Sequence, residues 1–392
     1  MLVSLAVDRS LAAARAASRL TSLRRLMAIA AIATLARLVI YIAYAQLYGS
    51  FDAICQWDCH WYVDTIDAGY DAAPRGVGHA IAKANWAFFP SYILASRAVT
   101  AILGVSVLHG AVIVSVLATF GFLLVSARYL ELTRGAIDPW LWAIFVLAFP
   151  NSFYLSSGYT ESLYLLVATA SLYAFMRERT YQTAGLVALT TATRAVGVTF
   201  LPLVILERLG FALRAWRRRS GSSALINDLA DSLLPIVIAP LGLVAFMAYL
   251  YHLTGDALAF SHVQASWGRG MGDPFHQLFR GLAKLDLSKL PEQSRTLNAL
   301  GAIVGLGAAG YLLARRRPIE AWLCASSVLI PLSTELDSLP RYVAGTPVFL
   351  FAMFDLLGEC RSIWLRWLII AACAALQLFL LRHWFLDAPF LT

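Results

Sequence analysis

Long apolar segments alternate with short polar turns along most of this chain. A helix needs about 20 apolar residues to cross a bilayer, and nine segments reach or approach that length. The turns between them carry clusters of arginine. This pattern predicts an all-α polytopic membrane protein. The nine segments are residues 26–48, 107–127, 139–155, 160–176, 231–251, 297–314, 319–335, 342–357 and 363–382.

Two further apolar segments are ambiguous. Residues 86–104 are interrupted by Pro90 and Arg97, and residues 182–206 could form one helix or two short helices broken at Arg194. Arginine-rich short loops favour the cytoplasmic side of a membrane. All basic clusters fall on one side if 86–104 is a juxtamembrane helix in the outer interface and 182–206 is a hairpin with Arg194 at its outer tip. This threading predicts about 11 transmembrane helices with the C-terminus outside.

Composition supports a membrane protein. Of the 392 residues, 60% are hydrophobic and 14% are charged, whereas a soluble domain carries about 25% charged residues. The net charge is +8, but the arginines occupy short turns, so no basic face for nucleic acid is predicted. We expect residues 1–25 to be a basic cytoplasmic N-terminus without a cleavable signal, and residues 26–392 to form a single transmembrane domain.

The polar residues collect in the segments that this threading places outside. The first outer loop, residues 51–106, opens with QWDCHWYVDTIDAGYD, in which acidic residues alternate with aromatic rings. A carboxylate can hold or take a proton while flat rings stack on a sugar, so this mixture favours carbohydrate chemistry. Residues 252–296 form a second outer loop. Cys55 and Cys59 could be joined by a disulfide in an oxidising compartment or could be two free thiols.

Six segments in order resemble one known family. WDCHWY, FFPSY, SSGYTESLYLL, LTTATRAVGVTFLPL, FSHVQASWGR and SLPRYVAGTPVF cover most of residues 51–350. They resemble the GPI mannosyltransferase 2 (PIG-V type) family and its prokaryotic relatives, in the GT-C superfamily of glycosyltransferases. The resemblance implies transfer of mannose from a polyprenyl-phosphate carrier, on the non-cytoplasmic face, to a glycolipid or other glycan acceptor. The alanine and arginine bias suggests a bacterial relative in the inner membrane, with its active site on the periplasmic or extracellular face.

Asp58 is the predicted general base. If the sugar is transferred with inversion, the acceptor hydroxyl must lose its proton as it attacks, and a carboxylate within about 3 Å can take it. The resemblance implies the same role, because GT-C enzymes carry an essential acid in the first outer loop. The alternative is a helix cap or a solvated side chain. Asp64, Asp67 and Asp71 recur at helical spacing and are better interpreted as a wet face.

Four charged residues are candidates for substrate binding. Glu161 opens a predicted helix and could contact a sugar hydroxyl, although an acid there is also favoured by the helix dipole. Arg194 lies within an apolar run, and an ionisable residue in such a run is by default a candidate site residue. Its planar fork suits a phosphodiester. Arg341 and Arg97 are further candidates for the same phosphate, with snorkelling to lipid headgroups as the alternative.

The aromatic residues of the first loop have two plausible uses. Trp57, Trp61 and Tyr62 could stack on sugar or anchor the loop at the headgroup level. His60 could help bind the donor phosphate, could orient the acceptor, or could be an ordinary surface histidine. In the second loop, Gln264, Trp267 and Arg269 resemble a Q-x-x-W-x-R pattern of the family, with interface packing as the alternative.

No metal-binding signature is complete. Asp58 and Glu161 together are candidate ligands for a divalent cation, but the first loop has no D-x-D motif. Three rival functions remain: transfer of another sugar from the same kind of carrier, transport of a lipid or sugar, and a non-catalytic scaffold. A transporter would favour internal repeats with polar residues at mid-membrane depth, and neither is found.

Overall fold

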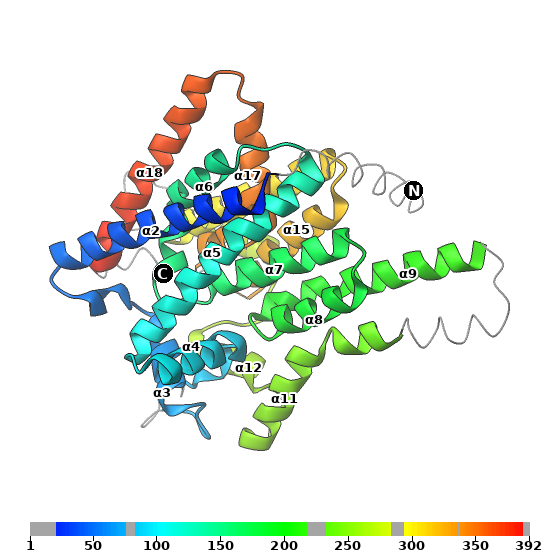
Figure 1. Cartoon of the computed structure of the whole chain (residues 1–392). Coiled ribbons are helices and arrows are strands. Elements are labelled where there is room, and N and C mark those ends of the chain that lie inside the picture. The colour runs from blue at the N-terminus through cyan, green and yellow to red at the C-terminus, as the bar shows by residue number, and fades with distance from the viewer. Residues whose placement is uncertain (1–20, 76–82, 218–232, 284–293, 335–337, 387–392) are drawn as a thin grey trace.

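The computed structural model describes residues 21–75, 83–217, 233–283, 294–334 and 338–386 (Figure 1). Within these ranges the chain is helical and contains no strand, apart from an isolated bridge between Arg75 and Lys83. The predicted all-α class is therefore confirmed. Most of the predicted basic N-terminus, residues 1–25, lies outside the described ranges, as do parts of both predicted outer loops.

Two helices form the centre of the bundle. Helix α5 (Val107–Arg134) and helix α7 (Glu161–Met176) run parallel to each other, because Ser115 bonds to the carbonyl of Tyr159 and Gly121 meets Leu166 one level further along. Small residues at this contact let the two backbones approach closely. The helices that surround this pair are α2 (Leu23–Leu47), α6 (Pro139–Ala148) and α8 (Thr180–Thr191).

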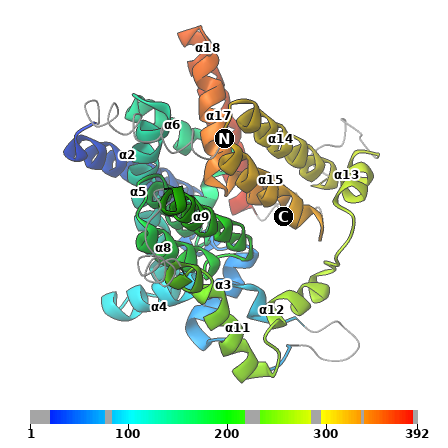
Figure 2. The same ribbon diagram turned by 90° about the vertical axis from the view of Figure 1, so that its right-hand side faces the viewer.

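A second group of helices lies beside this centre (Figure 2). It consists of α14 (Ser294–Ala314), α15 (Pro318–Leu332), α16 (Leu339–Ala344) and α17 (Pro347–Glu359). Short α16 packs closely on α14 because glycines leave room for its side chains. A Cβ at Gly301 would lie 3.0 Å from Pro340, and one at Gly305 would lie 3.0 Å from Val343. The last described helix, α18 (Ile363–Phe385), packs against α6 and α2.

Further helices and short 3₁₀ pieces complete the described chain. Around the first predicted loop they are η1 (Phe51–Ile54), α3 (Asp58–Ala68), η2 (Asn85–Ala87) and α4 (Pro90–Leu103). Between the longer helices they are η3 (Pro150–Ser156), η4 (Ala195–Phe200) and α9 (Leu201–Arg217). Around the second predicted loop they are α11 (Leu241–Thr254), α12 (Ala259–His262), η5 (Val263–Trp267) and α13 (Pro274–Leu282).

The prediction of about 11 transmembrane helices is not confirmed. Four helices in the described ranges are long and apolar enough to span a membrane: α2, α5, residues 295–314 of α14, and α18. A fifth results if α11 and residues 259–267, which meet at 82°, form one broken span. The other apolar segments fold as shorter helices, because proline, glycine and 3₁₀ turns interrupt them. Residues 86–104, for example, yield the 14-residue α4, which ends at Gly104 in the left-handed conformation.

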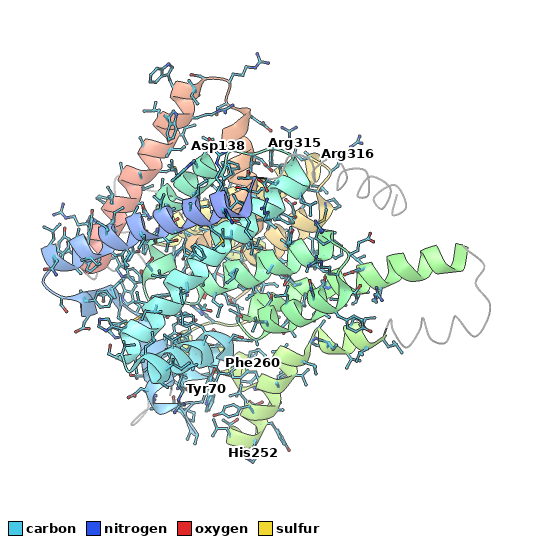
Figure 3. All side chains as sticks on the ribbon, in the orientation of Figure 1. Tyr70, Asp138, His252, Phe260, Arg315 and Arg316 are labelled. Atoms are coloured by element: carbon cyan, nitrogen blue, oxygen red, sulfur yellow. A yellow bond between two sulfur atoms is a disulfide. The ribbon has the colours of Figure 1, made fainter. Side chains whose placement is uncertain are left out.

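The two ends of the bundle differ in chemistry (Figure 3). Arg315 and Arg316 lie at one end, whereas Tyr70, His252 and Phe260 lie at the opposite end. Helix α5 connects the two. Its first turn lies beside η1, and its last residue, Arg134, is ion-paired with residues of α15 and α17.

Candidate active site

A covalent ring shapes the start of α3. Cys55 and Cys59 are joined by a disulfide, which resolves the alternative that the sequence left open. Inside this ring Trp57 has φ of 45°, in the left-handed region that is unfavourable for a residue with a side chain. Helix α3 begins at Asp58, directly after this strained residue. The ring therefore fixes the direction in which the Asp58 carboxylate leaves the backbone.

The start of α7 packs directly against this ring. Gly158 has φ of 74°, and a Cβ there would lie 3.0 Å from Cys59 Sγ, so only glycine lets the two turns meet. The hydroxyl of Tyr159 donates to the carbonyl of Gln56 at 2.8 Å. Glu161 then opens α7, where the helix dipole favours its negative charge. Two segments that are distant in sequence thus bring two carboxylates to one place.

The two arginines come from breaks between helices. Arg194 lies in extended conformation between α8 and η4, at the break that the sequence predicted. Arg341 lies on α16, which ends at Gly345. A Cβ at Gly345 would lie 3.4 Å from both Arg194 and Glu161. The absence of a side chain at Gly345 therefore lets both side chains pack against the end of α16.

These four side chains form one ion-paired cluster, here called the site cluster. Arg341 Nη2 lies 2.7 Å from Asp58 Oδ2, and Arg341 Nε lies 3.3 Å from Glu161 Oε1. Arg194 Nη1 lies 3.1 Å from the same Glu161 oxygen. The side chain of Glu161 is 3% exposed and those of both arginines are 10% exposed, whereas Asp58 is 31% exposed. Asp58 is therefore the member that an incoming molecule reaches most easily.

The cluster has unused hydrogen-bonding groups. Glu161 Oε2 and Arg341 Nε are buried and make no hydrogen bond within the described residues. A buried carboxylate oxygen without a partner is costly, and such atoms mark places where a ligand or water belongs. Both residues line a small cavity of about 10 Å³, which is the room that one water molecule needs. Its other walls are Phe149, Asn151, Ser152, Tyr154, Leu155, Leu165, Ala344, Gly345 and Leu350.

Tyrosine rings surround the two arginines. Arg341 lies over the rings of Tyr154, Tyr159 and Tyr342, at 5.7, 5.3 and 5.2 Å from the centroids. Arg194 lies 5.1 Å from the centroid of Tyr342. Such cation–π contacts stabilise guanidinium groups that have lost water. None of these tyrosines was predicted as a site residue, although Tyr159 lies within SSGYTESLYLL and Tyr342 lies within SLPRYVAGTPVF.

The aromatic residues of the first loop are engaged in packing. Tyr62 is buried against Tyr92 and Tyr159, and Trp57 meets Trp384 edge to face. One face of Trp61 stacks on Phe88, and Arg75 lies 5.5 Å from its centroid.

Two predicted polar residues stand apart from the site cluster. His60 and Arg97 are exposed on α3 and α4, and within the described residues neither forms an ion pair with the site cluster. Of the three other aspartates of the first loop, Asp64 and Asp71 bind Arg75, and Asp67 is exposed.

The Q-x-x-W-x-R residues lie beside the site cluster. Arg269 donates to the side-chain oxygen of Gln264 at 3.2 Å, and the ring of Trp267 meets Trp61 edge to face. Burial raises the pKa of the Tyr342 phenol, but the positive charges of Arg269 and Arg341 outweigh burial and bring that pKa below its usual value. Arg269 is therefore close enough to add positive charge to the site.

A comparison with protein-family models identifies the chain. The model of the mannosyltransferase (PIG-V) family matches residues 34–267, which is more than half of the sequence. The chain belongs to this family. Comparisons with curated proteins and with solved structures gave no match. The matched region contains Asp58, Glu161 and Arg194, and it ends before Arg269 and Arg341.

The donor set of the site cluster does not fit a resident metal. In the described ranges, no three His, Cys, Asp or Glu side chains gather as ligands. Asp58 and Glu161, the candidate ligands from the sequence, each face an arginine instead. Guanidinium groups at these oxygens would repel a cation.

Proposed function

We propose that this member of the PIG-V family transfers mannose, with inversion at the anomeric carbon, from a polyprenyl-phosphate carrier to a hydroxyl group of a glycolipid or other glycan. One observation carries the proposal. Two acids and two arginines from four separate segments form a single ion-paired cluster, and this cluster retains a buried carboxylate oxygen without a partner. Most buried carboxylate oxygens have a partner, so this open oxygen favours a place for a substrate group.

Each member has a role in the transfer. The acceptor oxygen attacks the anomeric carbon and gives its proton to the carboxylate of Asp58. The bond from that carbon to the phosphate oxygen breaks, and its electron pair leaves with the polyprenyl phosphate. Arg341 and Arg194 supply the planar donors that suit this anion. Arg341 also contacts Asp58, which places the leaving phosphate and the base on either side of one guanidinium group.

Glu161 has a positioning and binding role in this scheme. Its Oε1 holds both arginines, while Oε2 is free to accept a hydrogen bond from a sugar hydroxyl that enters the cavity. The cavity has room for about one water molecule, so the sugar ring itself must lie toward the more exposed Asp58. Arg269 adds a third positive charge, which makes the surroundings of Tyr342 net positive and suited to a phosphodiester.

We place the site on the non-cytoplasmic face of the membrane, with the N-terminus in the cytoplasm. The support is the polarity of the bundle, since Arg134 and Arg315 to Arg317 gather at the end opposite the site cluster. Basic residues favour the cytoplasmic side. A cysteine in place of exposed His60 tests this placement: in sealed cells, H60C should react with an impermeant maleimide added outside. Labelling only after the cells are opened would refute it.

The activity is tested by transfer of radiolabelled mannose from polyprenyl-phosphate mannose in membranes, with a mixture of glycolipid acceptors. The wild-type chain should transfer label, and D58N should be slower by about 10³-fold, within the range for loss of a general base. The matched control is D67N, which changes an exposed aspartate on the same helix. Normal transfer by folded D58N would remove Asp58 from the mechanism. Faster transfer from polyprenyl-phosphate glucose would replace mannose as the donor sugar.

A further inference from the structure

Trp384 occupies an unusual position in the last described helix. Helix α18 is the least buried of the candidate spans, with 11% of its apolar window buried, and Trp364 near its start is 82% exposed. Trp384, near its end, is completely buried. The end of α18 is therefore packed into the protein although most of the helix is not. Trp384 also lies far outside the region matched by the family model.

Trp384 contacts the ring that precedes Asp58. Its indole Nε1–H donates to the carbonyl of Ile54 at 2.9 Å, one residue before the disulfide. The indole also meets Trp57 edge to face, with the ring centroids 5.4 Å apart. Because Trp57 is held in the left-handed conformation, it needs support from its surroundings to stay there.

The same indole supports the opposite wall of the site. It packs against Tyr154 and Tyr159, at centroid distances of 5.2 and 5.5 Å. These are two of the three rings over which Arg341 lies. One side chain thus touches both the turn that presents Asp58 and the aromatic floor that holds the partner of Asp58.

We propose that Trp384 is a positioning residue of the active site, which holds Asp58 and Arg341 in register through Trp57 and the two tyrosines. Its effect on catalysis rests on the proposed function, whereas its effect on the order of the Asp58 turn does not. Phenylalanine at this position would keep an aromatic ring but lose the hydrogen bond to Ile54 and part of the contact area. A small displacement of a catalytic group lowers the rate with little effect on substrate binding.

The experiment compares W384F with W364F in the full-length chain, purified in detergent. Trp364 lies on the same helix and is exposed, so W364F controls for the loss of an indole from α18. For W384F we expect kcat to fall about tenfold, while KM for polyprenyl-phosphate mannose changes less than twofold, as for a displaced base. Amide hydrogen exchange in residues 51–61 should be faster than in W364F, with similar melting temperatures.

The outcomes separate positioning from bulk stability. Equal kcat values for W384F and W364F would overturn the proposal. So would a lower kcat accompanied by a lower melting temperature and unchanged exchange in residues 51–61. If W384F melts early, W384Y, which adds a hydroxyl donor to the phenyl ring, must restore both kcat and slow exchange. If the wild-type chain transfers no mannose, the proposed function fails, and the exchange of residues 51–61 alone decides whether Trp384 holds the Asp58 turn.

Discussion

Two buried arginine–carboxylate clusters lie at opposite ends of the bundle, and they differ in how completely their atoms are used. In the distal cluster, Arg134 donates to both oxygens of Glu320, at 2.7 and 2.5 Å, and also contacts Asp355. Tyr129 adds a hydrogen bond to Glu320. In the site cluster, a single oxygen of Glu161 holds two arginines and the other oxygen has no partner in the described structure.

The difference indicates how to tell structural ion clusters from functional ones. Both clusters are buried and both join distant segments, so neither burial nor charge distinguishes them. We propose that the use of their hydrogen-bonding atoms does, because both oxygens of Glu320 accept bonds, whereas Glu161 Oε2 accepts none among the described residues. A cluster that must receive a substrate has to leave some of these atoms open.

Removing the arginine of the distal cluster should affect the fold and spare the chemistry. R134M leaves Asp355 without its cation and leaves Glu320 with only the longer cationic contact to Arg317, at 3.5 Å. We expect a loss of about 3–5 kcal/mol in the free energy of unfolding. The transfer rate per folded molecule should remain close to that of the wild type. Denaturation in detergent, combined with activity normalised to folded protein, measures both. A large loss of kcat in the folded fraction would contradict the assignment of this cluster to structure.

The opposite result is expected in the site cluster. In E161Q the amide keeps an oxygen that Arg194 and Arg341 can reach, so unfolding should become easier by no more than about 2 kcal/mol. The transfer rate should fall about 10²-fold, since the charge that aligns both arginines is lost. Side-by-side assay of E161Q and E320Q sharpens the test. A smaller rate loss in E161Q than in E320Q would invert the comparison.

Replacing Arg194 with lysine separates charge from shape. R194K retains the positive charge but loses the planar fork, so one charge-assisted hydrogen bond to the phosphate is lost. We expect KM for the donor to rise about tenfold, as for a loss of about 1.4 kcal/mol, with a smaller change in kcat. The measurement is initial rate against donor concentration. An unchanged KM would indicate that Arg194 serves Glu161 and not the donor.

The smallest effect is expected on the exposed face of α3. D67N changes a solvated carboxylate, so unfolding free energy should stay within about 0.5 kcal/mol of the wild type and the rate should not change. The same two assays apply. A rate loss comparable to that of D58N would mean that the first loop binds substrate through its solvent-exposed face.

Local sequence patterns located the members of the site but not their pairing. Asp58, Glu161, Arg194 and Arg341 each stood out beside a motif or within an apolar run. Nothing in the sequence showed that Arg341 would reach both acids, because that contact depends on how α16 packs on the glycines of α14. Trp384 carried no local signal at all, since one buried tryptophan among many apolar residues looks like ordinary membrane helix.

The fold was predictable to a similar extent. Hydropathy gave the helical class and the places of the helices, and the arginine in residues 182–206 marked a real break between α8 and η4. Hydropathy overestimated the length of single helices, because residues 139–155 and residues 342–357 each fold as two helical pieces with a break between them. Apolar character reports the surroundings of a segment, whereas its length as one helix depends on where turns interrupt the hydrogen-bond ladder.

The length of helix α5 sets the distance between the two ends of the bundle. The 19 steps from Ser115, which bonds beside the start of α7, to Arg134 correspond to about 28 Å at 1.5 Å per residue. The hydrocarbon layer of a bilayer is about 30 Å thick. A membrane of ordinary thickness can thus leave both sets of charges in its polar margins at the same time. Inserting one extra turn into α5 would move one set of charges into the hydrocarbon layer.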